Sequence, residues 1–100
     1  MISLKGRRRA RLLASPFKPE WSRIIERNVP LFSRLPDADK AELLGHSQVF
    51  ISEKIWEGCG GLEVTDEIRV TIAAQACMLL LHRDTDYYPR VKVILVYPSG

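Results

Sequence analysis

The stretch IAAQACMLLL, residues 72–81, is the feature that most constrains the fold of this chain. Only Gln75 within it is polar, so apolar side chains would occupy nearly every side of a helix. A surface helix carries a single apolar stripe, whereas a helix that is apolar all round lies inside a core. Thr65 suits the N-cap and is followed by two acidic residues, which the positive end of a helix favours. The pattern predicts a core helix over about 65–83.

A second apolar element follows in the sequence RVKVILVYP. Only Lys92 interrupts its apolar character, which predicts a strand over about 91–97 with both faces buried. Such a strand needs neighbouring strands at its edges and cover on both faces. A chain of 100 residues offers too little for this, so we expect the front part of a larger domain. Apolar surface around Ile72–Leu81 and Val91–Val96 would then be exposed, and self-association would cover it.

The middle of the chain predicts helices and turns. Pro19 suits the first turn of a short amphipathic helix that docks through Trp21 and stops at Val29 before a proline. A second helix is expected from Asp37 to about Glu53, followed by a short extended segment. The sequence VFISEKIW also has the composition of a strand, which stays open as an alternative. The Gly-rich stretch EGCGG predicts a turn, and the whole pattern indicates a mostly helical α+β fold.

Charge divides the chain into two parts. Residues 1–15 contain five basic residues and no acidic one, whereas the other ten basic and twelve acidic residues leave the remainder with a net charge of −2. We expect 1–15 to be a mobile basic arm and 16–100 to be one domain. The arm is a candidate partner-binding segment through its basic side chains: Lys5, Arg7, Arg8, Arg9 and Arg11. Clustered arginines suit phosphates, but no aromatic residue lies between them, so the pattern does not favour a nucleic-acid partner.

No set of residues with catalytic or metal-binding spacing is found. The two histidines, His46 and His82, and the two cysteines lie far apart in the sequence, whereas zinc sites use closely spaced groups of them. His82 is expected at a helix C-terminus, where the helix dipole favours it; a metal site with the nearby Asp84 and Asp86 is the alternative. The glycines around Cys59 lack the Lys-Ser/Thr of a phosphate loop. The expectation is no catalytic residue, no metal ligand and no cofactor in this chain.

Composition also bears on the compartment. Two cysteines are too few for a disulfide scaffold. No apolar run reaches the length of a membrane span, and the apolar residues after the basic arm are too few for a signal peptide. A cytoplasmic protein without membrane contact is the expectation.

Several segments together resemble a known family. The sequences PEW, LFSRLP, FISEKIWEGCGGLEVTDEIRVTIAAQACMLLL and YYPRVKVILVYPSG are similar in order and spacing to the N-terminal half of the Mlc titration factor A family. The members of this family are bacterial zinc-dependent peptidases, also called glucose-regulated metallopeptidases. The resemblance covers about Pro16 to Gly100, and its most specific parts are IAAQAC followed by leucines, and VYP.

The resemblance implies a zincin-like fold and a catalytic helix with the sequence His-Glu-x-x-His. In such a site the two histidines bind zinc and the glutamate acts as general base on a bound water. The family places this helix after the strand that ends in VYP, where the present sequence stops. Neither His46 nor His82 matches a family ligand. The resemblance therefore implies a segment that is inactive without the C-terminal catalytic half, with zinc expected only in the complete protein.

Two further points follow from the resemblance and from the residues. Family members are linked to binding the glucose repressor Mlc in enteric bacteria, which makes a repressor protein a candidate partner by resemblance. The alternative to a peptidase segment is a small stand-alone binding module that contacts a protein or nucleic acid through the basic arm or an exposed apolar face. An independent small enzyme lacks any catalytic set in this sequence.

Overall fold

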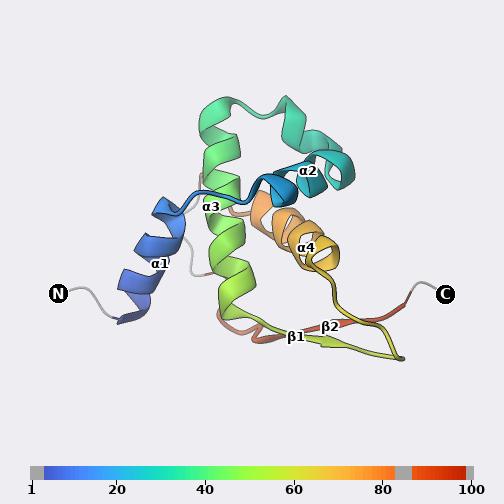
Figure 1. Cartoon of the computed structure of the whole chain (residues 1–100). Helices are drawn as coiled ribbons and strands as arrows, with labels where there is room; N and C mark the ends of the chain where they lie inside the picture. The colour runs from blue at the N-terminus through green and yellow to red at the C-terminus, as the bar shows by residue number, and fades with distance from the viewer. Residues whose placement is uncertain (1–3, 83–86, 99–100) are drawn as a thin grey trace.

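The computed structural model describes residues 4–82 and 87–98, and its fold is α+β and mostly helical, as the sequence predicts (Figure 1). The elements in chain order are α1 (Leu4–Ala14), α2 (Pro19–Asn28), the 3-10 helix η1 (Pro30–Arg34), α3 (Asp37–Glu53), β1 (Ile55–Gly58), α4 (Asp66–Met78) and β2 (Val93–Val96).

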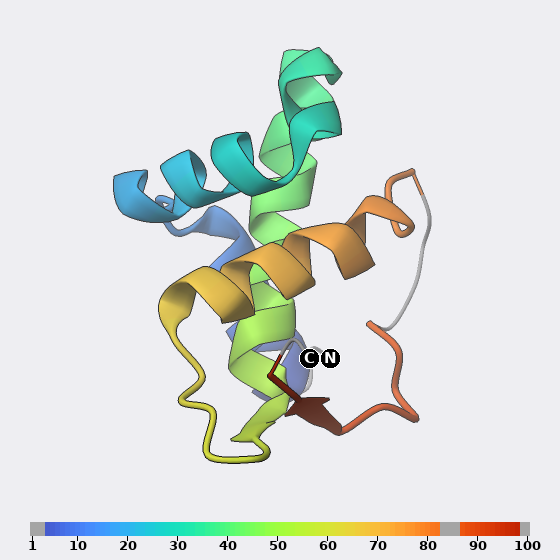
Figure 2. The same ribbon diagram turned by 90° about the vertical axis from the view of Figure 1, so that its right-hand side faces the viewer.

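Helix α3 is the centre of the molecule. Helix α1 packs against one side of it, and α4 crosses it on the other side while also contacting α2 (Figure 2). The predicted bounds of α3 are confirmed at both ends, although Pro36 rather than Asp37 is the N-cap. The predicted start of α2 at Pro19 and its end before Val29 are also confirmed.

Helix α4 is the core helix that the sequence predicts. From Ile68 to Met78 only Gln75 is exposed, because α2 and α3 cover the remaining sides of the helix. Its fully buried side chains are small or branched: Val70, Ala73, Ala74 and Cys77. The predicted N-cap is confirmed, since the Thr65 hydroxyl accepts a hydrogen bond from the backbone N–H of Ile68.

The end of α4 differs from the prediction. The helix stops at Met78 rather than near residue 83, and a turn follows in which the N–H of Leu80 bonds to the carbonyl of Cys77. His82 then adopts a left-handed backbone conformation with φ of 65°, and its N–H bonds to the side chain of Glu42. A tertiary contact therefore replaces the helical hydrogen bond that the apolar pattern suggested.

Strands β1 and β2 pair in parallel, with Ile55 opposite Val93 and Gly58 opposite Val96. Parallel neighbours need a crossover connection, which α4 provides in a β-α-β arrangement. The segment expected to be extended after Glu53 is thus strand β1. Trp56 and Ile94, which are paired in the register, pack against the helical core on one face of this sheet.

The opposite face of the sheet is exposed and mostly apolar. We call it the outer face; its apolar residues are Ile55, Val91, Val93, Leu95 and Tyr97, and Glu57 lies on it opposite Leu95. Val93 and Leu95 are 41% and 51% exposed, so the prediction that both faces of this strand are buried is wrong for this chain. The helices of the described chain all lie on the other side of the strands, as Figure 1 shows, and leave this face uncovered.

The prediction of exposed apolar surface is therefore half right. Around Val91–Val96 it is confirmed by the outer face. Around Ile72–Leu81 it is wrong, because only Gln75 and Leu79 are exposed in that range. Helices α2 and α3 cover α4 more completely than their lengths suggested.

The basic arm contains a helix. Residues 4–14 form α1, whereas their sequence predicted only a mobile arm, and Leu13 of this helix lies against Gly45 of α3. A Cβ atom at position 45 would stand 3.0 Å from Leu13 Cδ2, so a glycine inside α3 allows α1 to approach closely. The mobility of this arm in solution stays a prediction. Across residues 4–82 and 87–98, no helix has both the length and the apolar character that crossing a membrane requires.

Candidate functional site

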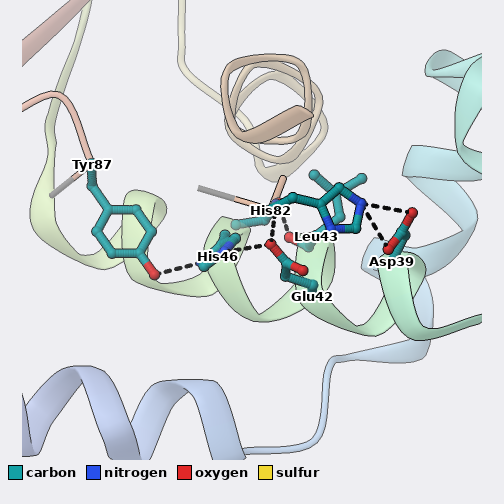
Figure 3. A network of polar contacts seen from close by, with 7 residues as sticks. Asp39, Glu42, Leu43, His46, His82 and Tyr87 are labelled. Carbon is teal, nitrogen blue, oxygen red and sulfur yellow. Dashed lines mark hydrogen bonds and ion pairs between the residues drawn. The ribbon is translucent and has the colours of Figure 1, made fainter. Parts of the chain in front are cut away.

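A network of polar side chains joins α3 to the segment that follows α4 (Figure 3). Asp39, Glu42 and His46 lie three and four residues apart in α3, so they share one face of this helix. Two residues from beyond α4, His82 and Tyr87, reach this face. The network therefore connects residues about forty positions apart in the sequence.

Glu42 lies at the centre of this network. Its Oε2 atom accepts a hydrogen bond from the backbone N–H of His82 at 2.9 Å and lies 3.3 Å from Nε2 of His46. The bond from the His82 backbone is the main reason why the pKa of Glu42 is lower than its ordinary value. Glu42 is therefore an ionised carboxylate at neutral pH.

His46 lies between Glu42 and a buried tyrosine, Tyr87, and contacts both. Its Nδ1 atom lies 2.5 Å from the Tyr87 hydroxyl, and the two rings meet edge to face with centroids 5.2 Å apart. Burial raises the pKa of Tyr87 to about 12, so the hydroxyl keeps its proton. Since the Glu42 carboxylate only accepts hydrogen bonds, its contact with His46 needs a proton on Nε2, and in that neutral tautomer Nδ1 accepts from the Tyr87 hydroxyl.

Asp39 and His82 form the outer end of the network. Nε2 of His82 lies 3.2 Å from both carboxylate oxygens of Asp39. The Asp39 side chain is 17% exposed and the His82 side chain is 68% exposed, so one end of this contact faces water. The expectation that His82 interacts with the end of a helix is wrong, because α4 ends four residues earlier and His82 pairs with Asp39 instead.

Three of these residues could hold a metal ion. One ligand atom from each of Asp39, Glu42 and His82 lies within 4.8 Å of the others. Sequence reasoning missed this group, because no local spacing links His82 to α3; the only signal was the spacing of Asp39, Glu42 and His46 on one helical face. The alternative partners Asp84 and Asp86 lie outside the described residues.

The catalytic zinc site that the family resemblance implies does not fit the residues of this chain. Such a site needs two histidines one helical turn apart with a glutamate beside the first. The two histidines of this sequence, His46 and His82, are separated by 36 positions in the sequence rather than four, and neither is followed by glutamate. The absence of catalytic residues from this chain stays a prediction.

The basic side chains of α1 fall into two groups. Lys5, Arg7, Arg8 and Arg11 are exposed. Arg9 is half-buried, donates two hydrogen bonds to the Glu53 carboxylate at 2.6 and 2.7 Å, and lies over the Tyr87 ring. Arg9 therefore fastens α1 to the end of α3, which is a structural role. A partner-binding role for the four exposed basic residues stays a prediction.

The Arg9–Glu53 contact gives a testable pH dependence. Hydrogen bonds from Arg9 lower the pKa of Glu53. A carboxylate with a lowered pKa adds stability above its ordinary pKa of about 4.5 and loses that contribution as the pH falls through the lowered value. We expect Glu53→Gln to reduce the free energy of unfolding by about 1–3 kcal/mol at pH 7, and by much less at pH 3. Urea unfolding at both pH values measures this difference.

The control for that experiment is Glu57→Gln, which removes an exposed carboxylate from β1. An equal loss in both variants at pH 7, or no loss in Glu53→Gln, would show that Arg9 does not hold α1 against α3 in solution. The same experiment therefore tests whether the basic arm is mobile.

Comparisons with known proteins place the chain in a family. A sequence profile of the glucose-regulated metallopeptidases, family M90, matches residues 4–100. An uncharacterised protein of the cyanobacterium Synechocystis is 37% identical over 93 residues. That match covers 93% of the present chain and 34% of the relative, so the chain spans about a third of the relative's length. No solved structure gives a significant match. The profile covers nearly the whole chain, and the chain therefore belongs to the glucose-regulated metallopeptidase family.

Proposed function

We propose that this chain forms the N-terminal segment of a zinc-dependent, zincin-like peptidase domain and is inactive alone. The observation that carries the proposal is the outer face, where Val93 and Leu95 stand half-exposed beside Ile55 on a parallel sheet. Parallel sheets occur almost only where both faces are covered. A further part of a larger domain, packed on this face, would give the sheet the cover it needs.

The position of α4 supports the same proposal. The helix packs against α2 and α3 and stands between β1 and β2 in a β-α-β unit. A catalytic part packed on the outer face would rest on this unit. Strand β2 also has a single described neighbour, β1, which leaves an edge for a further strand.

The chemistry of the complete peptidase would come from residues beyond position 100. When bound there, zinc would polarise the scissile carbonyl and lower the pKa of a water molecule. The described residues of this chain would position that part and shield its apolar surface from water. A bacterial, cytoplasmic setting and a repressor protein as partner belong to the same proposal through the family resemblance.

The test compares the chain alone with a chimera. In the chimera, this chain replaces the aligned segment of the Synechocystis relative, and the remaining two thirds of the relative are kept. We expect the chimera to hydrolyse fluorogenic peptides in a zinc-dependent way and the 100-residue chain to show no hydrolysis above buffer. The proposal implies a His-Glu-x-x-His sequence in the remaining part of the relative, and replacing its glutamate with glutamine gives the inactive control.

Zinc-dependent hydrolysis by the isolated chain would refute inactivity of the segment. A folded chimera without hydrolysis, with an apolar dye still bound at the outer face, would refute the assignment of that face to the catalytic part. Partner binding by the isolated chain through α1 would then make the small binding module the better description.

A further inference from the structure

We propose that Asp39, Glu42 and His82 bind one divalent transition-metal ion, with Zn²⁺ as the expected occupant. This accessory site would join the first half of α3 to the turn after α4. It uses none of the residues that a His-Glu-x-x-His site requires, so it is independent of the proposed peptidase function. It also departs from the expectation that this chain holds no metal ligand.

The chemistry of the three ligand side chains determines which class of metal ion they would bind. Two carboxylates and one imidazole are a ligand set that suits zinc and neighbouring transition metals. Magnesium and calcium prefer oxygen ligands alone, so the imidazole of His82 disfavours them. Three protein ligands also leave a coordination position for water on the exposed side of His82.

The distances are close to those of a coordinated ion. Zinc binds nitrogen and oxygen at about 2.1 Å, so the ligand atoms of a tetrahedral site stand about 3.4 Å apart. Nε2 of His82 already lies 3.2 Å from the Asp39 oxygens. The atom contributed by Glu42 lies within 4.8 Å of the other two, so a modest side-chain rotation closes the site.

The surroundings hold two of the ligands in place. Asp39 and Glu42 project from one face of α3, and the backbone of His82 is fixed by its hydrogen bond to Glu42. Both contacts of Glu42 within the described part of the chain involve Oε2, which leaves Oε1 for an ion. The carboxylate is further oriented by His46, which Tyr87 orients in turn. Outer contacts of this kind support the ligands of known metal sites.

An ordinary ion pair is the competing explanation. A protonated His82 would pair with Asp39, and exposed pairs of that kind contribute about 0–1 kcal/mol. This explanation uses only the Asp39 carboxylate, whereas Glu42 contacts the His82 backbone and the His46 ring through Oε2. The two explanations differ in one measurable respect, because only a metal site responds to zinc.

The experiment titrates ZnCl₂ into the EDTA-treated and dialysed 100-residue chain by calorimetry, with MgCl₂ as the comparison ion. We expect one Zn²⁺ per chain and no measurable heat from Mg²⁺. Asp39→Asn and His82→Gln should each weaken zinc binding at least tenfold. Asp37→Asn removes the same charge from the same helical turn at an exposed position and should bind zinc as the unaltered chain does.

Circular dichroism in EDTA checks that each variant is folded. X-ray absorption of the zinc-loaded, unaltered chain gives a second measurement that needs no variant, and we expect oxygen ligands with one imidazole. A sulfur ligand, which only Cys59, Cys77 or a methionine could supply, would overturn the proposal. Absence of saturable zinc binding, or equal binding by Asp39→Asn and Asp37→Asn, would also overturn it. None of these readouts depends on peptidase activity.

Discussion

Leu43→Ala should lower the free energy of unfolding by about 2–5 kcal/mol, because it removes a fully buried side chain and leaves a cavity. Leu43 lies in α3, the helix that contacts both α1 and α4. A cavity there cannot be filled by a small movement of one neighbour. Small domains are stable by only about 5–15 kcal/mol, so this single change would remove a large part of the total. Urea unfolding monitored by tryptophan fluorescence measures the loss.

The control is Leu79→Ala, which makes the same chemical change at a position that is 67% exposed. We expect a change of about 0.5 kcal/mol or less for that variant. Comparable losses at the two positions would mean that α3 does not form the centre of the folded chain.

Local signals explain why α2, α3 and α4 could be predicted from the sequence. Pro19, Thr65 and the acidic residues after them mark helix starts through backbone chemistry that neighbouring residues determine. The apolar character of α4 correctly predicted its burial. The end of α4 could not be predicted in the same way, because the N–H of His82 bonds to Glu42, forty residues away in the sequence.

The candidate metal site could also be predicted only in part from the sequence. Asp39, Glu42 and His46 lie on one helical face, which their spacing predicts. No rule of spacing brings His82 to them, since its position depends on where α4 ends and on a left-handed backbone conformation. Arg9 is a similar case: its sequence context predicted a mobile basic arm, and its contact with Glu53 depends on the packing of α1.

The burial of the two faces of the sheet bears on whether this chain is part of a larger domain. An apolar strand predicts burial on both faces, and the structure buries only the face with Trp56 and Ile94. The chain also matches about a third of its Synechocystis relative. The exposed outer face and the short span of the match are independent observations, and both support the proposal of a larger peptidase domain.

Lys54→Met should lower the free energy of unfolding by about 2–5 kcal/mol, because it removes the donor to two buried or half-buried carbonyl groups. Lys54 is only 8% exposed, and its Nζ atom donates to the carbonyl oxygens of Tyr87 at 2.6 Å and Tyr88 at 2.9 Å. Both tyrosines have left-handed backbone conformations, which cost free energy unless tertiary contacts hold them. Urea unfolding, with hydrogen exchange at β2, measures the loss.

Lys92→Met is the matched control, since Lys92 is exposed and stands just before β2. The control should change stability by about 0.5 kcal/mol or less. We expect Lys54→Met to increase hydrogen exchange at β2 and to weaken zinc binding as well, because Tyr87 orients His46 and through it Glu42. Loss of stability with unchanged zinc affinity would separate the two effects and show that Tyr87 does not support the metal site. Equal stability of the two variants would mean that Lys54 does not anchor the segment before β2.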